Sequence, residues 1–333
     1  MTYAKLGRSN LSVSRICLGT MHFGPRALEK EAFRIMDRAL EAGINFFDTA
    51  NVYGGNAGPG KTEEIIGKWF SQGAGRRDKV VLATKVYGAM GDSPGPNEEA
   101  GISAYKVRRH IADSLRRLQT DHVDLYQVHH IDRRIAGEEF WGAFEGLVDK
   151  GDVTYVGTSN FPGWGLAKFQ MLALQRGFLG IVSEQAQYNL LNRIPELEVI
   201  PAAREFGIGL LAYMPLAGGL LAGKRRAEPE SRTSVVEGEY RMKVEGNQQL
   251  AAFSELCRKI GEDERVVAIA WTLANPATVS AIVGMRSVDN LDGVLRAAEI
   301  QLDNETMSGL DEIFDINHGR PLQKGEAPKA WAW

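Results

Sequence analysis

Four side chains that can move a proton or hold a charge follow short apolar runs of the sequence: Asp48, Tyr53, Lys85 and His129. A lysine and an aspartate that meet away from water each favour the charged form of the other. A phenol beside that ammonium ion should lose its proton more easily than an ordinary tyrosine, whose pKa is roughly 10. Tyr53 would then donate a proton to a carbonyl oxygen, and His129 would orient the carbonyl by a hydrogen bond.

Each of these residues also has an ordinary structural interpretation. Asp48 precedes a threonine, as in many turns, Lys85 can be a solvated strand end, and His129 can be a hydrogen-bonded core residue. The catalytic interpretation is stronger because these residues end three successive predicted strands, as an assembled site requires.

The alternation of side chains along a strand makes the expectation more specific. Phe46 and Asp48 should share one face, and so should Gln127 and His129. By the same rule His129 and His130 should point in opposite directions. The sequence "HHID" would otherwise suggest a metal site, since histidine and aspartate are common ligands. We therefore predict no bound metal.

The stretch "GNAGPGKT", residues 55–62, matches the Gly-x4-Gly-Lys-Thr pattern of a nucleoside triphosphate loop. Such a loop must begin where a strand ends, but the run "INFF" ends at Phe47 and "DTANVYG" intervenes. The match is interpreted as chance, and ATP binding through Lys61 stays open as an alternative function.

Eight short apolar runs, often rich in β-branched residues, predict the strands that position these side chains. They are "RICLG", "INFFD", "VVLATK", "VDLYQVH", "TYVGTS", "GIVSEQ", "GIGLLAY" and "VSAIVG". The polar residues that end them are Asp48, Lys85, His129, Ser159, Gln185 and Tyr213. In a barrel of parallel strands the reacting groups lie at these C-terminal ends.

Segments of helical periodicity lie between the runs. They are 30–41, 63–71, 104–118, 139–149, 164–174, 196–205, 266–273 and 289–298. Eight strand-helix units favour an α/β fold with one closed (β/α)8 TIM barrel over an open sheet. The turn "CLGTMHFGP" also lacks the glycine pattern of the open dinucleotide-binding sheet.

We expect one barrel domain over residues 1–333, with additions at both ends of the barrel. A β-hairpin in residues 1–14 should close the bottom. Long loops at 88–102 and 218–248 should lie at the C-terminal face, and the latter is expected to serve the cofactor or substrate. The tail, residues 318–333, should reach toward the mouth.

Composition excludes several classes of protein. The chain has 333 residues, 44% of them hydrophobic and 24% charged, and a formal net charge of -3, which gives no basic field for nucleic acid or anionic membrane. No apolar run approaches the roughly 20 residues of a membrane span. The two cysteines lack metal-ligand spacing and no signal peptide is evident, so we expect a cytoplasmic protein. A homo-oligomer is compatible with this composition.

With these residues in view, the sequence resembles the aldo-keto reductases over essentially its whole length. The matching segments, in order, are "NFFDTANVYG", "LATK", "DLYQVH", "VGTSNF", "SEQAQYNLL" and "LLAYMPLAGGLL". The resemblance implies a catalytic tetrad of Asp48, Tyr53, Lys85 and His129, with Tyr53 as general acid and base. It implies reduction of a small-molecule aldehyde or ketone by NADPH.

The resemblance also implies how NADPH would lie across the barrel mouth. Ser159, Asn160 and Gln185 would bind the nicotinamide carboxamide, and Tyr213 would stack on the ring. Residues of the loop after the seventh strand, Leu216, Gly218, Leu220 and Lys224, would lie along the pyrophosphate. In "IVGMRSVDNL", similar to the family's adenosine-phosphate segment, Gly284, Arg286, Ser287 and Asn290 would contact the cofactor, with Arg286 on the 2′-phosphate.

One departure concerns adenine, since many relatives continue with Glu-Asn where this chain has Gly293 and Val294. We therefore expect looser adenine recognition. His22 and Trp164 follow strands and are either substrate-pocket or packing residues.

Within the family the chain resembles the longer bacterial members related to potassium-channel β subunits. The tail "GEAPKAWAW" is similar to reductases of antibiotic deoxysugar pathways. That similarity implies a nucleotide-linked keto-deoxysugar as substrate, and a broad aldehyde reductase fits equally. The alternative is an NADPH-binding redox-sensing regulatory subunit with slow turnover.

Overall fold

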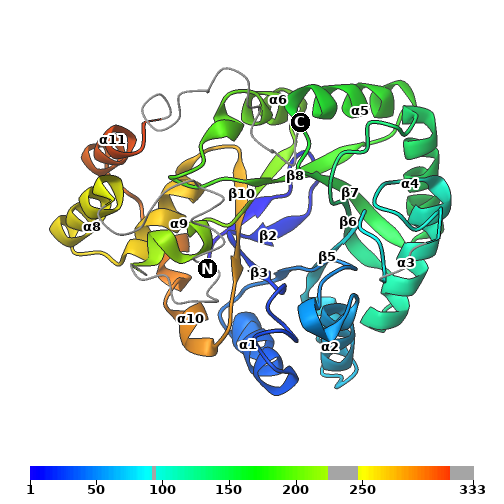
Figure 1. Cartoon of the computed structure of the whole chain (residues 1–333), viewed down its shortest axis with the longest axis horizontal. Coiled ribbons are helices and arrows are strands. Elements are labelled where there is room, and N and C mark those ends of the chain that lie inside the picture. Colours follow the sequence, from blue (N-terminus) through cyan, green and yellow to red (C-terminus); the bar gives the residue numbers. More distant parts are fainter. Residues whose placement is uncertain (92–94, 224–246, 316–333) are drawn as a thin grey trace.

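A closed barrel of eight parallel strands forms the centre of the molecule (Figure 1). The computed structural model describes residues 1–91, 95–223 and 247–315. The strands pair in the order β10-β3-β4-β5-β6-β7-β8-β9. Their bounds are β3 Ile16–Gly19, β4 Phe46–Asp48, β5 Val81–Val86, β6 Val123–Val128, β7 Val153–Ser159, β8 Ile181–Gln187, β9 Gly209–Tyr213 and β10 Thr278–Gly284. The predicted (β/α)8 TIM barrel is confirmed.

The barrel strands are buried on both faces, which explains why they appear as continuous apolar runs in the sequence. All six residues of β5 are buried. Alternate residues point inward, where Phe46, Ala83 and Leu125 belong to one interior cluster. Phe47 and Leu82 point outward into the larger cluster between the strands and the helices.

Helices surround the strands in Figure 1. Their bounds are α1 Glu29–Glu41, α2 Lys61–Phe70, α3 Ala104–Leu118, α4 Gly137–Lys150, α5 Gly163–Gln175, α6 Val199–Phe206, α8 Gln248–Ile260, α9 Glu264–Ala274, α10 Val288–Asp292 and α11 Asn304–Ile313. The single helix predicted at 289–298 is wrong, because α10 ends at Asp292, with Gly293 as its C-cap, and a separate 3-10 turn, Leu295–Ala298, follows. Helices α8 and α11, which were not predicted, pack on each other at the flank beside α9.

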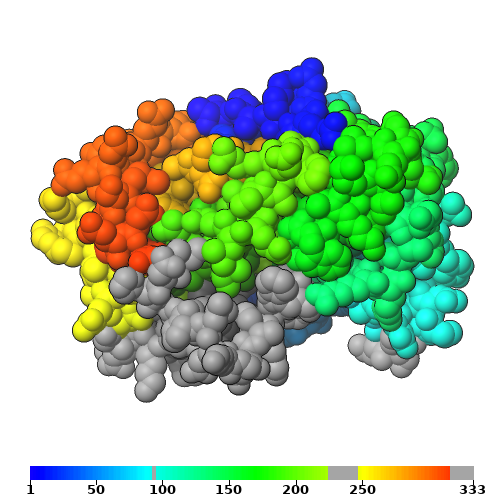
Figure 2. Space-filling model, turned by 90° about the horizontal axis from the view of Figure 1, so that it is seen from above, coloured from blue at the N-terminus to red at the C-terminus, as the bar shows by residue number. Residues whose placement is uncertain are grey.

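The N-terminal hairpin consists of β1 (Tyr3–Lys5) and β2 (Ser12–Ser14), paired antiparallel. Gly7, in its turn, has a φ of +54°, and a Cβ there would lie 2.1 Å from the Val182 carbonyl oxygen and 2.7 Å from the Gly209 nitrogen. Both residues lie near the N-terminal ends of their strands, so the hairpin closes the bottom of the barrel as predicted. In Figure 2 the residues of the N-terminal hairpin, coloured dark blue, lie along one side of the molecule.

The C-terminal ends of the strands meet at the opposite end of the barrel. The loop predicted at 218–248 begins with a 3-10 segment, Ala217–Ala222, and lies partly outside the described residues. The tail at 318–333 also lies outside them. Among the helices of the described chain, none is long and apolar enough to cross a membrane.

Candidate active site

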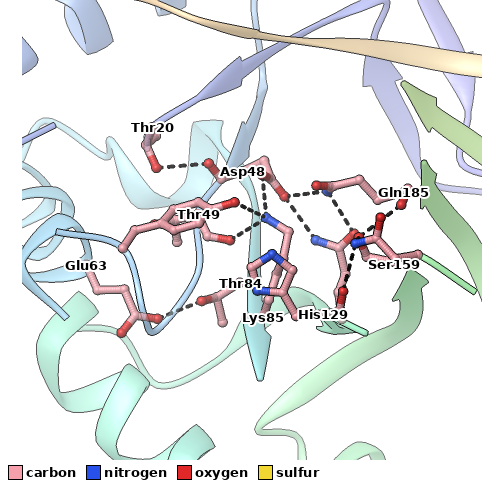
Figure 3. A network of polar contacts seen from close by, with 12 residues as sticks. Thr20, Asp48, Thr49, Glu63, Thr84, Lys85, His129, Ser159 and Gln185 are labelled. Carbon is pink, nitrogen blue, oxygen red and sulfur yellow. Dashed lines mark hydrogen bonds and ion pairs between the residues drawn. The ribbon is translucent and has the colours of Figure 1, made fainter. Parts of the chain in front are cut away.

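Lys85 is at the centre of the polar network inside the barrel mouth (Figure 3). Its side chain is fully buried, and its ammonium nitrogen lies 2.6 Å from Asp48 Oδ2, 2.9 Å from the Thr49 carbonyl oxygen and 3.3 Å from the Tyr53 hydroxyl. An ammonium group has three N–H donors, and these three acceptors use all of them. The group therefore has a fixed direction, with one N–H on the phenol.

Asp48 is held on both of its carboxylate oxygens. Oδ1 accepts from Gln127 Nε2 at 3.0 Å and from Gln185 Nε2 at 2.9 Å, while Oδ2 faces Lys85. Burial by itself would lower the pKa of Lys85, but the charge of Asp48 and the Tyr53 phenol act in the other direction, and the resulting pKa is above the usual 10.5. The lysine is therefore charged at neutral pH.

The aromatic side chains of the site form a continuous run. The rings of Tyr53 and His129 meet edge to face with centroids 5.9 Å apart, and those of His129 and His130 stack at 4.9 Å. The expectation that the two histidines point in opposite directions is wrong. Strand β6 ends at Val128, so alternation no longer applies at residue 129.

Both histidines are uncharged at neutral pH. Burial, with the nearby charge of Lys85 and the neighbouring His130, holds the pKa of His129 well below its usual value. Burial and Lys85 lower the pKa of His130 to about 4. A neutral imidazole carries one N–H, so His129 has one donor for a ligand oxygen across the working pH range.

The ends of β7, β8 and β9 bring together the residues expected to bind a carboxamide. Ser159 Oγ donates to the Gln185 carbonyl at 2.9 Å, and Asn160 Nδ2 donates to Ser159 Oγ and to the His129 carbonyl, each at 3.0 Å. The Tyr213 hydroxyl donates to Asn160 Oδ1 at 2.9 Å. These residues therefore form one connected group beside the Asp48–Lys85 pair.

The proposed phosphate-binding residues lie near the end of β10 and on the loop after β9. Gly284, Arg286 and Asn290 are exposed, and Ser287 caps α10 by accepting from the Asn290 N–H. In the loop, Leu216 and Gly218 are half-buried, whereas the Leu220 side chain is buried in the core. Only the backbone of Leu220 is therefore suited to a cofactor contact. Lys224 lies outside the described residues.

Comparison with known proteins places these features in a family. The aldo/keto reductase family model matches residues 15–315. The chain belongs to the aldo/keto reductase family. It is 52% identical to the uncharacterized oxidoreductase YrpG of Bacillus subtilis over all of both chains. It is 31% identical to versiconal hemiacetal acetate reductase of Aspergillus parasiticus over 94% of this chain and 97% of that protein.

A third relative is norsolorinic acid reductase of Emericella nidulans, 29% identical over 94% of this chain and 81% of that protein. Membership of the family makes this protein an oxidoreductase that acts on small carbonyl substrates, and aldo/keto reductases use nicotinamide cofactors.

Many aldo/keto reductases have a glutamate near adenine at the position of Gly293 in this chain. A Cβ added at Gly293 would lie 2.7 Å from Arg265 Nη1. The guanidinium of Arg265, held by both oxygens of Asp263, thus takes the space above Gly293. A glutamate at position 293 would have to displace it.

His22 and Trp164, the two pocket candidates, lie in different places. His22 is buried, and a Cβ on Gly284 would contact its ring at 3.1 Å, so His22 lies between the ends of β3 and β10. Trp164 lies in the first turn of α5, is 43% exposed, and has the Arg133 guanidinium 5.8 Å from its ring centroid. His22 is thus enclosed between two strand ends, whereas the Trp164 ring remains partly accessible.

Sequence analysis did not identify several residues that hold the site in place. Asn51 Nδ2 lies 2.9 Å from His110 Nδ1, and His110 Nε2 lies 2.8 Å from Glu98 Oε2. Burial is the main cause that lowers the pKa of His110, so the neutral ring accepts from Asn51 and donates to Glu98. These two hydrogen bonds connect the loop that carries Tyr53 to α3. The sequence signal was a histidine in phase with the buried face of that helix, beside Val107.

The glycine-rich stretch 55–62 does not form a phosphate cradle. Strand β4 ends at Asp48, and the Thr62 hydroxyl, which would face a magnesium ion, donates to the Phe23 carbonyl at 2.9 Å. Lys61 pairs with Glu64 at 3.0 Å. The buried Thr62 hydroxyl is therefore held by the fold, whereas Lys61 forms only a partly exposed surface pair. The position of β4 and the Thr62 contact support the interpretation of the match as chance. Within the described ranges no group of three or more acidic, histidine or cysteine side chains is arranged to hold a metal.

Proposed function

We propose that the protein is an NADPH-dependent carbonyl reductase in which Tyr53 donates the proton to the substrate oxygen. The observation that supports this most directly is the contact of the Lys85 ammonium with both Asp48 and the Tyr53 hydroxyl. A buried ammonium at 3.3 Å from the phenol oxygen stabilises the negative charge that develops there as the proton leaves.

His129 is the second donor to the carbonyl oxygen in this proposal. Because burial and Lys85 keep its ring neutral, it orients the substrate by a hydrogen bond and does not compete with Tyr53 as an acid. Two donors aimed at one oxygen favour the transition state, in which that oxygen carries more negative charge than in the ground state.

The chain's own residues fit a nicotinamide cofactor, which supplies hydride to the carbonyl carbon when bound. Asn160 and Gln185 present amide groups beside the Lys85 network, and the Tyr213 ring ends the adjacent strand β9. Gly218 and Gly219 have φ values of 68° and 111°, in the region that favours glycine, and because they have no Cβ a ligand can approach the backbone closely there. We propose that this loop follows the pyrophosphate.

Arg286 is proposed to bind the 2′-phosphate that distinguishes NADPH from NADH. Replacing it with alanine should weaken NADPH by about 10- to 100-fold, the value of charge-assisted hydrogen bonds, and leave NADH nearly unchanged. Fluorescence titration with both cofactors measures this. The matched control is Arg296→Ala, an exposed arginine already paired with Glu262, which should change neither affinity. Equal losses for NADPH and NADH in Arg286→Ala would contradict the assignment.

For the substrate we propose a nucleotide-linked keto-deoxysugar, on the resemblance of the C-terminal tail. The two relatives named as reductases of versiconal hemiacetal acetate and norsolorinic acid show that the family also includes enzymes named for other substrates. The deciding assay follows the loss of NADPH absorbance with a panel of keto-deoxysugar nucleotides and simple aldehydes. Turnover of aldehydes alone supports a broad reductase. Tight NADPH binding without turnover supports the redox-sensing regulatory subunit.

A further inference from the structure

Glu184, on strand β8, is a fully buried carboxyl group that no cation balances among the described residues. Its Oε2 lies 2.5 Å from Thr158 Oγ1, and its Oε1 accepts from the Phe161 N–H at 2.9 Å. Glu63 is equally buried but has Arg117 at 2.7 Å. Buried acids are usually paired, so the unpaired state of Glu184 requires an explanation.

The contacts of Glu184 bracket one turn. Thr158 precedes Ser159 and Asn160, and Phe161 follows them. Asn160 has a φ of 57°, in the left-handed region that asparagine adopts more readily than other non-glycine residues. The Asn160 N–H also donates to the Gln185 carbonyl at 3.0 Å. Glu184 therefore fixes both ends of the turn that presents the proposed carboxamide contacts.

Complete burial without a cation among the described residues favours the neutral form of this carboxyl group. Burial raises the pKa of Glu184 to about 8, against the smaller opposing effects of the Thr158 hydroxyl and the N–H groups of Phe161 and Asn160. No charged side chain in the described part of β7, β9 or α5 contributes to that shift, and its register partner on β9 is Leu210. The Thr158 hydroxyl can donate to Glu184 Oε2 or to the Ser183 carbonyl, which lies 3.4 Å away. A protonated Glu184 can therefore donate to the Thr158 oxygen while that hydroxyl donates to Ser183, and it still accepts from the Phe161 N–H.

We propose that Glu184 is a positioning residue that, as a neutral carboxyl, holds the turn of Ser159 and Asn160 in the shape that receives the nicotinamide carboxamide. This inference rests on the proposed function. It adds a residue that does not touch the cofactor and acts through the backbone of the turn.

The test measures NADPH affinity from pH 6 to 10 in the full-length protein and in two variants. Glu184→Gln reproduces the neutral carboxyl and cannot ionise. We expect it to bind NADPH like the wild type at pH 7, and the ratio of wild-type to variant affinity to fall above pH 8, where the native carboxyl ionises without a cation. Glu184→Leu leaves the Phe161 N–H without its acceptor and should weaken NADPH about tenfold.

Thr158→Val is the matched control for the other end of the turn and should weaken NADPH less than Glu184→Leu, because Phe161 keeps its acceptor. A constant ratio for Glu184→Gln across the pH range, or wild-type affinity in Glu184→Leu, would overturn the proposal. If Glu184→Leu does not fold, the pH comparison with Glu184→Gln decides alone. Absence of NADPH binding in the wild type would instead reject the proposed function.

Discussion

Tyr53→Phe is expected to lower carbonyl reduction by about 10²- to 10⁴-fold, the range that a positioned general acid contributes, while NADPH affinity stays unchanged. The ring remains, so its edge contact with His129 and its place beside Lys85 are kept. Only the hydroxyl that accepts the 3.3 Å contact from Lys85 is lost. Single-turnover reduction of a substrate by NADPH, with a separate fluorescence titration, measures the two quantities.

The matched control for Tyr53→Phe is the same change at Tyr126. That hydroxyl is buried on the outward face of β6, and it has no hydrogen-bond partner among the residues that the structure describes. Tyr126→Phe should therefore reduce substrate at the wild-type rate. Near-normal turnover in Tyr53→Phe would show that Tyr53 is not the acid. The proton would then have to come from another donor, such as His129 or the Lys85 N–H that no longer contacts a phenol.

The sequence predicted the positions of Asp48 and Lys85 because their strands are short, buried runs that end in one polar residue. In a closed parallel barrel such ends converge, so strand assignment alone brings them together. The alternation of side chains along a strand predicts that Gln127 faces the barrel interior, because it shares a strand face with Leu125, two residues before it. It was not recognised as a partner of Asp48, because only the barrel closure brings those two strands' side chains into contact.

Other features depend on local detail that the pattern of apolar residues does not contain. His129 and His130 stack because β6 ends one residue earlier than the apolar run implied. The helix expected at 289–298 is divided because Gly293 ends α10 and Arg265 packs over it. Glu184 lies on the strand face opposite that of its inward-facing neighbour Gln185, so a search of inward-facing residues does not find it.

Variants of the Asp48–Lys85 pair can separate the contribution of Lys85 to the free energy of unfolding from its contribution to turnover. Lys85→Met leaves the buried Asp48 carboxylate with only Gln127 and Gln185 as donors. Removing one partner of a buried ion pair typically costs about 3–5 kcal/mol of the free energy of unfolding. Lys85→Met should therefore be strongly destabilised and inactive. Because the folded-state pKa of Lys85 lies above 10.5, the pair is intact at neutral pH, and its contribution is lost only as the pH rises past that value.

The double variant Lys85→Met with Asp48→Asn distinguishes the two effects. A neutral amide can keep hydrogen bonds to both glutamines, so most of the lost stability should return in urea unfolding. Turnover should not return, since no ammonium remains beside the Tyr53 oxygen. If the double variant recovered both stability and turnover, Lys85 would be a structural partner of Asp48 alone, and the charge that assists Tyr53 would have to come from elsewhere in the site.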